Sequence, residues 1–375
     1  MIEYPYSKHQ FDENEIDAVV DVLRNGWISR GPRVSQFEIN FSSLLGYAHS
    51  VACTNGSAAL EIILRSAGIG QGDEVIVPTL SWASTATSVS MVGAEPKFAD
   101  IDISNYCVSY TSISELISNR TKAIIVVHFA GIAADMDKIW EIAESNGLHV
   151  IEDCAHALGG SYQDSKPIGS SCRSYAGAFS LHPAKNITTA EGGMIVTNDS
   201  ERAKNLKLYR SGGVRRNEES SLSKAKYDIP VISSNYHTTD IQAAIGMVQL
   251  TKLPSFINTR RNQVTQYNKN LGNIEGLNLH SHPETSAANL YIPLLPVHVD
   301  RDNLFSTLNS IGIGAYYHYP LIHKSSVYNK INMFCKYAEE YSQRALTLPL
   351  GPHLKIGDID RISEQLVRIL KPFKN

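Results

Sequence analysis

The stretch "SVACTNGSAALEIILRSAG" (residues 50–68) joins a short apolar run, a glycine turn and a longer apolar segment. The first run has the length of a strand, and the segment that follows Gly56 has the length and apolar content of a helix. A strand that passes through a tight turn into a helix is the unit from which parallel sheets are built. We therefore searched the rest of the chain for the same unit.

Short apolar runs recur along the next 130 or so residues and are separated by helical or loop segments such as "DMDKIWEIAESNG". With the run at residue 51 they make seven predicted strands: "DEVIVP", "PKFADID", "KAIIVVHF", "LHVIEDC", "GAFSL" and "GGMIVTND". This alternation predicts an α/β fold, with a mostly parallel sheet covered by helices on both faces. Ligands of such sheets bind beyond the carboxyl ends of the strands, so candidate residues are sought there.

Two further helices carry sequence signals at their ends. The segment 11–26 contains both residues of a capping box and a terminal glycine. A long helix is predicted over 239–271, where Thr239 and Gln242 form a second capping box. Pro254 is expected to bend or interrupt that helix.

The remaining segments indicate two domains. Residues 200–236 look irregular and polar, and after residue 285 the pattern restarts with a predicted strand, "LYIPLLPV", followed by helices. We expect a large domain over 1–250 and a smaller α+β domain over 251–375, with the long helix as connector.

Composition excludes several classes of protein. The chain has 375 residues, 43% of them hydrophobic and 19% charged, with a net charge of −3 and scattered Lys and Arg. These values argue against nucleic acid or a membrane as a partner. The N-terminus has no secretion signal, and the five cysteines form no C-x-x-C pair, so we expect a cytoplasmic protein with reduced thiols. The histidines show no regular ligand spacing, so no metal site is predicted.

Two charged residues stand beyond predicted strands. Asp153 follows "LHVIE", where a carboxylate is costly unless it has a partner. It is either a capping or ion-paired residue, or the carboxylate that holds a protonated ring nitrogen of pyridoxal phosphate. Lys185 follows "AFSL". It is either a solvated lysine or a desolvated one able to form a Schiff base with an aldehyde.

Other residues at the same edge complete a possible cofactor site. Gly56 and Ser57 open a predicted helix, whose free N–H groups suit a phosphate, although a plain helix cap has the same pattern. The hydroxyl of Ser180 can reach the same phosphate. Trp82 follows another strand and is placed either to stack on a flat ring or to pack in the core. Together these residues point to pyridoxal phosphate chemistry.

With these residues in place, the chain resembles the DegT/DnrJ/EryC1/StrS family of sugar aminotransferases. Members of this family have the aspartate-aminotransferase-like fold type I of pyridoxal phosphate enzymes. The resemblance covers nearly the whole chain. It rests on the ordered stretches "GWISRGPRVSQFE", "TNGSAAL", "GDEVIVPTLSWAST", "PKFADID", "VVHFAGIAADMDKI", "IEDCAHALGGSY", "FSLHPAKNITTAEGGMIVTND", "SNYHTTDIQAAIGMVQLTKL", "GIGAYYHYPLIH" and "LTLPL".

The resemblance implies a role for each matching residue. Lys185 is expected to bind the cofactor aldehyde, and Asp153 to hold the pyridinium nitrogen. His156 is expected near the cofactor ring or its O3′ oxygen, and Trp82 to stack on the ring. The expected phosphate-binding residues are Gly56, Ser57, Ser180 and, reaching across from the other subunit of a homodimer, Asn235. His318, Tyr319 and His323 lie in the segment that borders the sugar in relatives.

The resemblance also implies the reaction. We expect transfer of an amino group from L-glutamate to a keto-sugar, most simply a nucleotide-linked 4-keto-6-deoxyhexose, for surface polysaccharide (including lipopolysaccharide) or other amino-sugar biosynthesis. The alternatives are a dehydratase, amination of a 3-keto or non-nucleotide keto-sugar, and a non-catalytic regulatory protein that binds the cofactor. Dehydratases of this family replace the lysine with histidine, whereas Lys185 is present here. Ala190 departs from the glycine that many members have before "EGG".

Overall fold

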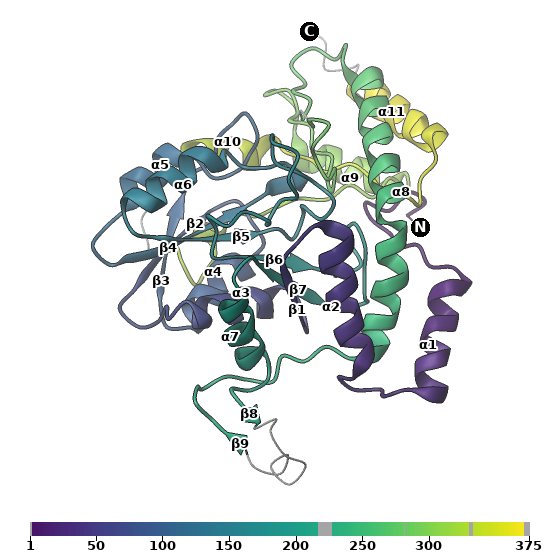
Figure 1. Cartoon of the computed structure of the whole chain (residues 1–375). Coiled ribbons are helices and arrows are strands. Elements are labelled where there is room, and N and C mark those ends of the chain that lie inside the picture. Colours follow the sequence, from purple (N-terminus) through teal and green to yellow (C-terminus); the bar gives the residue numbers. More distant parts are fainter. Residues whose placement is uncertain (1, 217–226, 281, 330–332, 371–375) are drawn as a thin grey trace.

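A seven-stranded sheet forms the centre of the computed structural model, which describes residues 2–216, 227–280, 282–329 and 333–370 (Figure 1). The order across the sheet is β1-β7-β6-β5-β4-β2-β3. The strands are β1 (His49–Cys53), β2 (Glu74–Pro78), β3 (Glu95–Ala99), β4 (Thr121–Val127), β5 (His149–Asp153), β6 (Ala176–Ser180) and β7 (Gly193–Thr197).

The sheet is mostly parallel, as predicted. Strands β3, β2, β4, β5 and β6 pair in parallel, whereas β7 runs antiparallel to both β6 and β1. All seven strands fall on the apolar runs of the sequence, because strands buried on both faces need continuous apolar side chains. The carboxyl ends of β2, β4, β5 and β6 therefore meet at one edge of the sheet.

Helices cover both faces of the sheet (Figure 1). One face packs against α3 (Gly56–Ser66), α4 (Ser84–Met91) and α7 (Ser200–Arg210). The other packs against α2 (Pro32–Leu45), α5 (Tyr110–Leu116), α6 (Met136–Ser145), α10 (Lys336–Arg344) and the first half of α8 (Asp240–Leu271). This three-layer arrangement confirms the predicted fold class.

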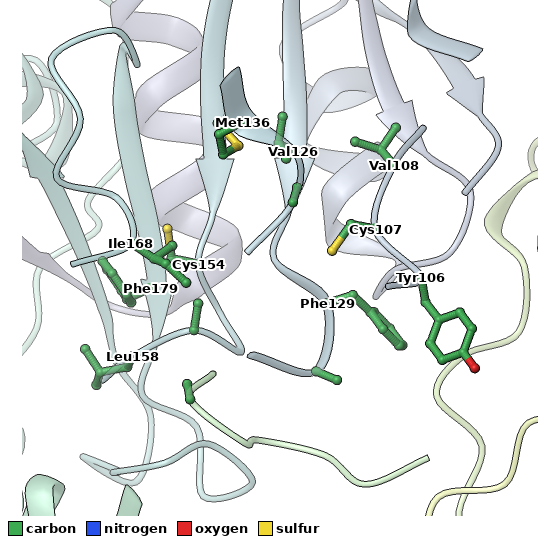
Figure 2. Packing of buried hydrophobic residues seen from close by; sticks show 14 of the residues in the cluster. Tyr106, Cys107, Val108, Val126, Phe129, Met136, Cys154, Leu158, Ile168 and Phe179 are labelled. Atoms are coloured by element: carbon green, nitrogen blue, oxygen red, sulfur yellow. The ribbon is translucent and has the colours of Figure 1, made fainter. Parts of the chain in front are cut away.

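The buried side chains on this second face form one continuous cluster, part of which is seen in Figure 2. Cys154, Ile168 and Phe179 gather beneath the end of β5, and Phe129 lies beyond the end of β4 (Figure 2). All four side chains are fully buried. Close packing at this point fixes the backbone on which the polar residues of the sheet edge are mounted.

The capping boxes predicted for the helices over 11–26 and 239–271 are confirmed. Helix α1 (Glu13–Asn25) has Asp12 and Glu15 as its capping box, and α8 has Thr239 and Gln242. Pro254, however, does not interrupt α8, which runs unbroken from Asp240 to Leu271. Buried leucines on both sides of the proline, with α1, α2 and α11 packed along the helix, offset the lost hydrogen bond.

Two other local predictions were wrong. Residues 200–210 form α7 rather than an irregular segment, because Asp199 caps the helix and Leu206 is buried under the sheet. Two short strands, β8 (Arg215–Arg216) and β9 (Tyr227–Asp228), follow it, and residues 217–226 of that irregular segment lie outside the described residues. The predicted strand at 290–297 makes only isolated bridges, since its two prolines cannot donate to a ladder.

The C-terminal part of the chain has its own buried cluster. This cluster draws all its members from residues 264–370 and includes α9 (Arg301–Ser310) and α11 (Ile356–Leu370). The second half of α8 contributes to it, while the first half packs on the large sheet. The predicted domain boundary near residue 250 stays a prediction. Within the described residues, none of the helices combines the length and the hydropathy needed to span a bilayer.

Candidate active site

Asp153 is the last residue of β5 and lies at the carboxyl edge of the sheet, 6% exposed. The hydroxyl of Thr85 donates a hydrogen bond to its Oδ2 at 2.9 Å, and the backbone N–H of Ala155 donates to its Oδ1 at 3.1 Å. The hydroxyl of Ser81 lies 2.7 Å from that of Thr85, so Ser81, Thr85 and Asp153 are linked by consecutive hydrogen bonds. These donors orient the carboxylate before any ligand binds.

Asp153 and Lys185 influence each other electrostatically. Burial raises the pKa of Asp153 above its ordinary value, although the hydrogen bonds from Ala155 and Thr85 and the charge of Lys185 oppose the shift. Burial also lowers the pKa of Lys185 to about 8, and the negative charge of Asp153 opposes this shift. A lysine with this pKa is a free amine in about a tenth of molecules at pH 7, far more than a lysine of ordinary pKa.

The loop between β6 and β7 holds Lys185 in place. The backbone N–H of Lys185 donates to the carbonyl of His182 at 2.9 Å, and that of Thr189 donates back to Leu181 at 3.0 Å. Ala190 closes the loop with a φ of 70°, in the left-handed region that favours glycine. The glycine that many family members have at this position is thereby explained.

The glycines after Ala190 allow close approach of two backbones. A Cβ on Gly193 would lie 2.3 Å from the carbonyl oxygen of Asn55, the N-cap of α3. Similarly, a Cβ on Gly56 would lie 2.9 Å from Cβ of Ser180. Only glycine fits at both points, so the start of α3 and the end of β6 come together as the sequence predicted for a phosphate cradle.

A cavity of about 500 Å³ opens above these residues. Its wall contains Lys185, Asp153 and the start of α3, together with several aromatic side chains. Nine predicted site residues line it: Gly56, Ser57, Trp82, Asp153, His156, Ser180, Lys185, His318 and Tyr319. These predicted residues, from Gly56 to Tyr319, come from distant parts of the chain and surround one space.

Two predicted site residues lie elsewhere. Asn235 lines a separate hollow of about 1210 Å³ beside α7. His323 is 2% exposed, and its Nδ1 contacts the hydroxyl of Thr79, behind the wall of the cavity. Its Nε2 lies 3.6 Å from a carboxylate oxygen of Glu339. His323 therefore contacts other side chains of the protein and does not line the cavity.

Several residues of the site were not predicted from the sequence, among them Thr85, His182, Tyr6 and Tyr316. Thr85 lies in the first turn of α4 and bonds to Asp153, but a threonine at a helix start has no distinctive sequence signal. His182 also lines the cavity, and its carbonyl anchors the lysine turn. Tyr6 and Tyr316, which stack with ring centroids 4.9 Å apart, come from opposite ends of the chain, so nothing in the sequence links them.

The comparison with known proteins agrees with this geometry. The model of the DegT/DnrJ/EryC1/StrS aminotransferase family matches residues 9–367. The chain belongs to this family. It is a pyridoxal phosphate-dependent sugar aminotransferase, because the family and its solved members carry that chemistry.

Several solved structures are similar over nearly the whole chain. PseC from Helicobacter pylori, an aminotransferase involved in the biosynthesis of pseudoaminic acid, is 27% identical with a TM-score of 0.91, covering 99% of this chain and 100% of PseC. DesV from S. venezuelae, solved with a ketimine intermediate, is 30% identical with a TM-score of 0.87 and coverages of 95% and 94%. DesI, solved with its TDP-sugar product, is 25% identical with a TM-score of 0.88 and coverages of 98% and 92%.

The residues of the cavity fit pyridoxal phosphate. A buried carboxylate with fixed orientation suits a protonated ring nitrogen, and a lysine of lowered pKa suits an aldehyde. The cradle between Gly56 and Ser180, at a helix N-terminus, suits a phosphate. The donor set therefore agrees with the cofactor that the family uses.

Proposed function

We propose that the protein transfers the amino group of L-glutamate to a nucleotide-linked keto-sugar, with a 4-keto-6-deoxyhexose as the favoured substrate class. One observation carries the proposal: a lysine with a pKa of about 8 and a buried, oriented aspartate line the same cavity. The TDP-sugar product bound by DesI supports a nucleotide-linked substrate. A role in surface polysaccharide (including lipopolysaccharide) or other amino-sugar biosynthesis is part of the proposal.

The chain's own residues divide the work. When bound, pyridoxal phosphate supplies an aldehyde that captures an amino group and a ring that accepts the electrons released by C–H cleavage. Lys185 would hold the aldehyde and then, as a free amine, carry the proton at Nζ as general acid and base. Asp153 would accept a hydrogen bond from the ring nitrogen and keep it protonated, while Gly56, Ser57 and Ser180 bind the phosphate.

Asn235 supports a homodimer with shared sites. Its hollow is separate from the cavity of its own chain and is lined by the basic residues Lys207, Arg210 and Arg215. Positive charge at this hollow suits an anionic ligand held by a second copy of the chain. We propose that Asn235 acts in the partner's active site, so each site is complete only in the dimer.

Mixing two inactive variants tests the shared site. Both the Lys185→Ala and the Asn235→Ala homodimers are expected to be nearly inactive. If Asn235 serves the partner, a hybrid dimer has one site with both substitutions and one intact site. An equal mixture then recovers about a quarter of the wild-type rate after subunit exchange. No recovery, with hybrids verified by mass, would place Asn235 in its own site and contradict the proposal.

A substrate panel tests the reaction. Purified protein is incubated with L-glutamate and with 4-keto or 3-keto sugars, nucleotide-linked and free, and products are identified by mass spectrometry. We expect the mass change of a ketone converted to an amine with the nucleotide-linked 4-keto-6-deoxy substrates. Loss of water without amine gain would indicate a dehydratase, and amination only of 3-keto or free sugars would overturn the substrate class. Cofactor binding without turnover of any substrate would favour the regulatory alternative.

The proposal also places the enzyme in the cytoplasm. All five cysteines are free, and four of them are buried. Free thiols are typical of proteins kept in a reducing compartment.

A further inference from the structure

His156 has both ring nitrogens engaged by the protein. The backbone N–H of Ala130 approaches Nδ1 at 3.3 Å, and the hydroxyl of Tyr319 lies 2.9 Å from Nε2. A backbone N–H only donates, so Nδ1 must be the acceptor and carries no hydrogen. In a neutral imidazole the hydrogen is then on Nε2, and Nε2 donates to the oxygen of Tyr319.

The imidazole of His156 is neutral. Its side chain is 5% exposed, and burial together with the charge of Lys185 lowers its pKa well below the ordinary value. The groups that face the ring are Ala130, Phe129 and Tyr319, with Lys185 and His318 nearby, so no carboxylate of the cavity pairs with it directly. The tautomer therefore follows from the hydrogen-bond pattern alone.

The turn that carries Ala130 is held from both sides. Ala130 has a φ of 55°, in the left-handed region, which aims its N–H at His156. Its carbonyl accepts from the N–H of Asn289 at 3.0 Å. On the other side His128, which precedes the turn, is fixed through Nε2 to Glu152 Oε2 at 2.8 Å. A conformation that is strained for alanine persists only when its surroundings impose it.

Tyr319 receives a hydrogen bond and has one hydrogen left to give. Burial raises the pKa of its hydroxyl well above the ordinary value, so it keeps this hydrogen. Within the described part of the chain, the contact with His156 is the one hydrogen bond that the hydroxyl makes. Tyr319 lines the cavity, and its ring packs edge-on against Trp82 at 5.8 Å. The remaining hydrogen is thus available to a ligand in that cavity.

We infer that Tyr319, and not His156, is the hydrogen-bond donor that this pair presents to the bound ligand, with His156 acting as a positioning residue locked by Ala130. The acceptor is an oxygen: either the phenolic O3′ of the cofactor or the carbonyl oxygen of the keto-sugar. The second source rests on the proposed function, whereas the first requires only the cofactor. Sequence matching had assigned the cofactor contact to His156 itself.

The tautomer is tested without any turnover. Imidazole nitrogens of ¹⁵N-histidine-labelled holoenzyme are recorded by NMR, and the His156 signals are assigned by their loss in His156→Gln. We expect Nδ1 to be unprotonated and Nε2 protonated across neutral pH. A protonated Nδ1 would overturn the inference, whatever reaction the enzyme catalyses.

The role of the hydroxyl is tested with Tyr319→Phe, which keeps the ring against Trp82. Its matched control is Tyr317→Phe, which removes a neighbouring hydroxyl bonded to Asp302 at 2.9 Å. A donor to O3′ stabilises its negative charge, so its loss raises the pH midpoint of the cofactor's visible absorption by about one unit. A donor to the sugar carbonyl leaves this midpoint unchanged, and its loss weakens keto-sugar binding about tenfold by calorimetry.

The outcomes distinguish the two possible acceptors, the cofactor O3′ and the sugar carbonyl. A midpoint shift in Tyr319→Phe but not Tyr317→Phe assigns the acceptor to O3′, and weaker sugar binding alone assigns it to the substrate carbonyl. Unchanged midpoint and unchanged binding would overturn the inference. If wild-type protein aminates no sugar, the proposed function fails, but the NMR and absorption measurements still judge the role of Tyr319.

Discussion

Replacing Lys185 with alanine is expected to lower the rate of amino transfer by about 10⁴-fold, because the cavity loses its proton carrier. The pKa of about 8 lets Lys185 act as a free amine near neutral pH, and among the described residues that line the cavity it is the one lysine. Borohydride treatment of wild-type holoenzyme should fix the cofactor onto Lys185, as seen by peptide mass. The alanine variant should show no such adduct.

Lys166→Ala is the matched control for this experiment. The Lys166 side chain is 71% exposed and pairs with Asp164 at the surface, so its loss should leave the rate within twofold. Lys185→Arg separates charge from chemistry, since arginine keeps a cation but cannot act as a free amine. A Lys185→Ala enzyme within tenfold of the wild-type rate would refute the mechanism.

Replacing Asp153 with asparagine is expected to lower the rate by about 10³-fold, the effect of losing one preorganised electrostatic contact. An amide has no negative charge to keep the ring nitrogen protonated, so the ring accepts electrons poorly. An asparagine keeps both contacts when its oxygen accepts from the N–H of Ala155 and its N–H₂ donates to the hydroxyl of Thr85, whose own hydrogen then turns to Ser81, so the geometry of the site is retained. The expected loss is therefore in kcat rather than in cofactor occupancy, and stopped-flow kinetics with glutamate measure it.

The melting temperature of cofactor-free Asp153→Asn provides the control. Because burial raises the pKa of Asp153 in the folded protein, the ionised carboxylate costs free energy of folding above its unfolded pKa. Asp153→Asn removes that cost, so the cofactor-free variant should melt no lower than wild type at pH 7. A variant that loses both activity and thermal stability would indicate a structural role for Asp153.

Thr85→Val tests how far orientation matters. It removes the donor at 2.9 Å from Asp153 while keeping the shape of the side chain. We expect a loss intermediate between wild type and Asp153→Asn, because Ala155 still holds the other carboxylate oxygen.

Much of the site was predictable because its residues lie next to strong local patterns. Asp153 and Lys185 each follow an apolar strand, and Gly56 follows another at a helix start. Once the strands were recognised as parallel, their carboxyl ends had to meet, so these residues had to lie close together. The close approach of Gly193 to the backbone of Asn55, where a Cβ would collide, appears only in the folded chain.

Other features left no local signal. Tyr6 and Tyr316 line the cavity, and Thr85 bonds to Asp153, only through contacts between distant segments. The placement of His323 behind the cavity wall depends on how the segment after Tyr319 packs against Thr79. Pro254 illustrates the same limit, since the sequence predicts a bend or an interruption at the proline, whereas the helix continues through it.

The sequence by itself determined the sheet, its covering helices and the identity of the residues at its carboxyl edge, because apolar periodicity and glycine turns act over a few residues. Only the tertiary structure decided the protonation pattern of the site. The lowered pKa of Lys185, the tautomer of His156 and the free hydrogen of Tyr319 all depend on burial and on partners from several segments. Desolvation and hydrogen-bond direction are properties of the assembled cavity, and a linear sequence does not contain them.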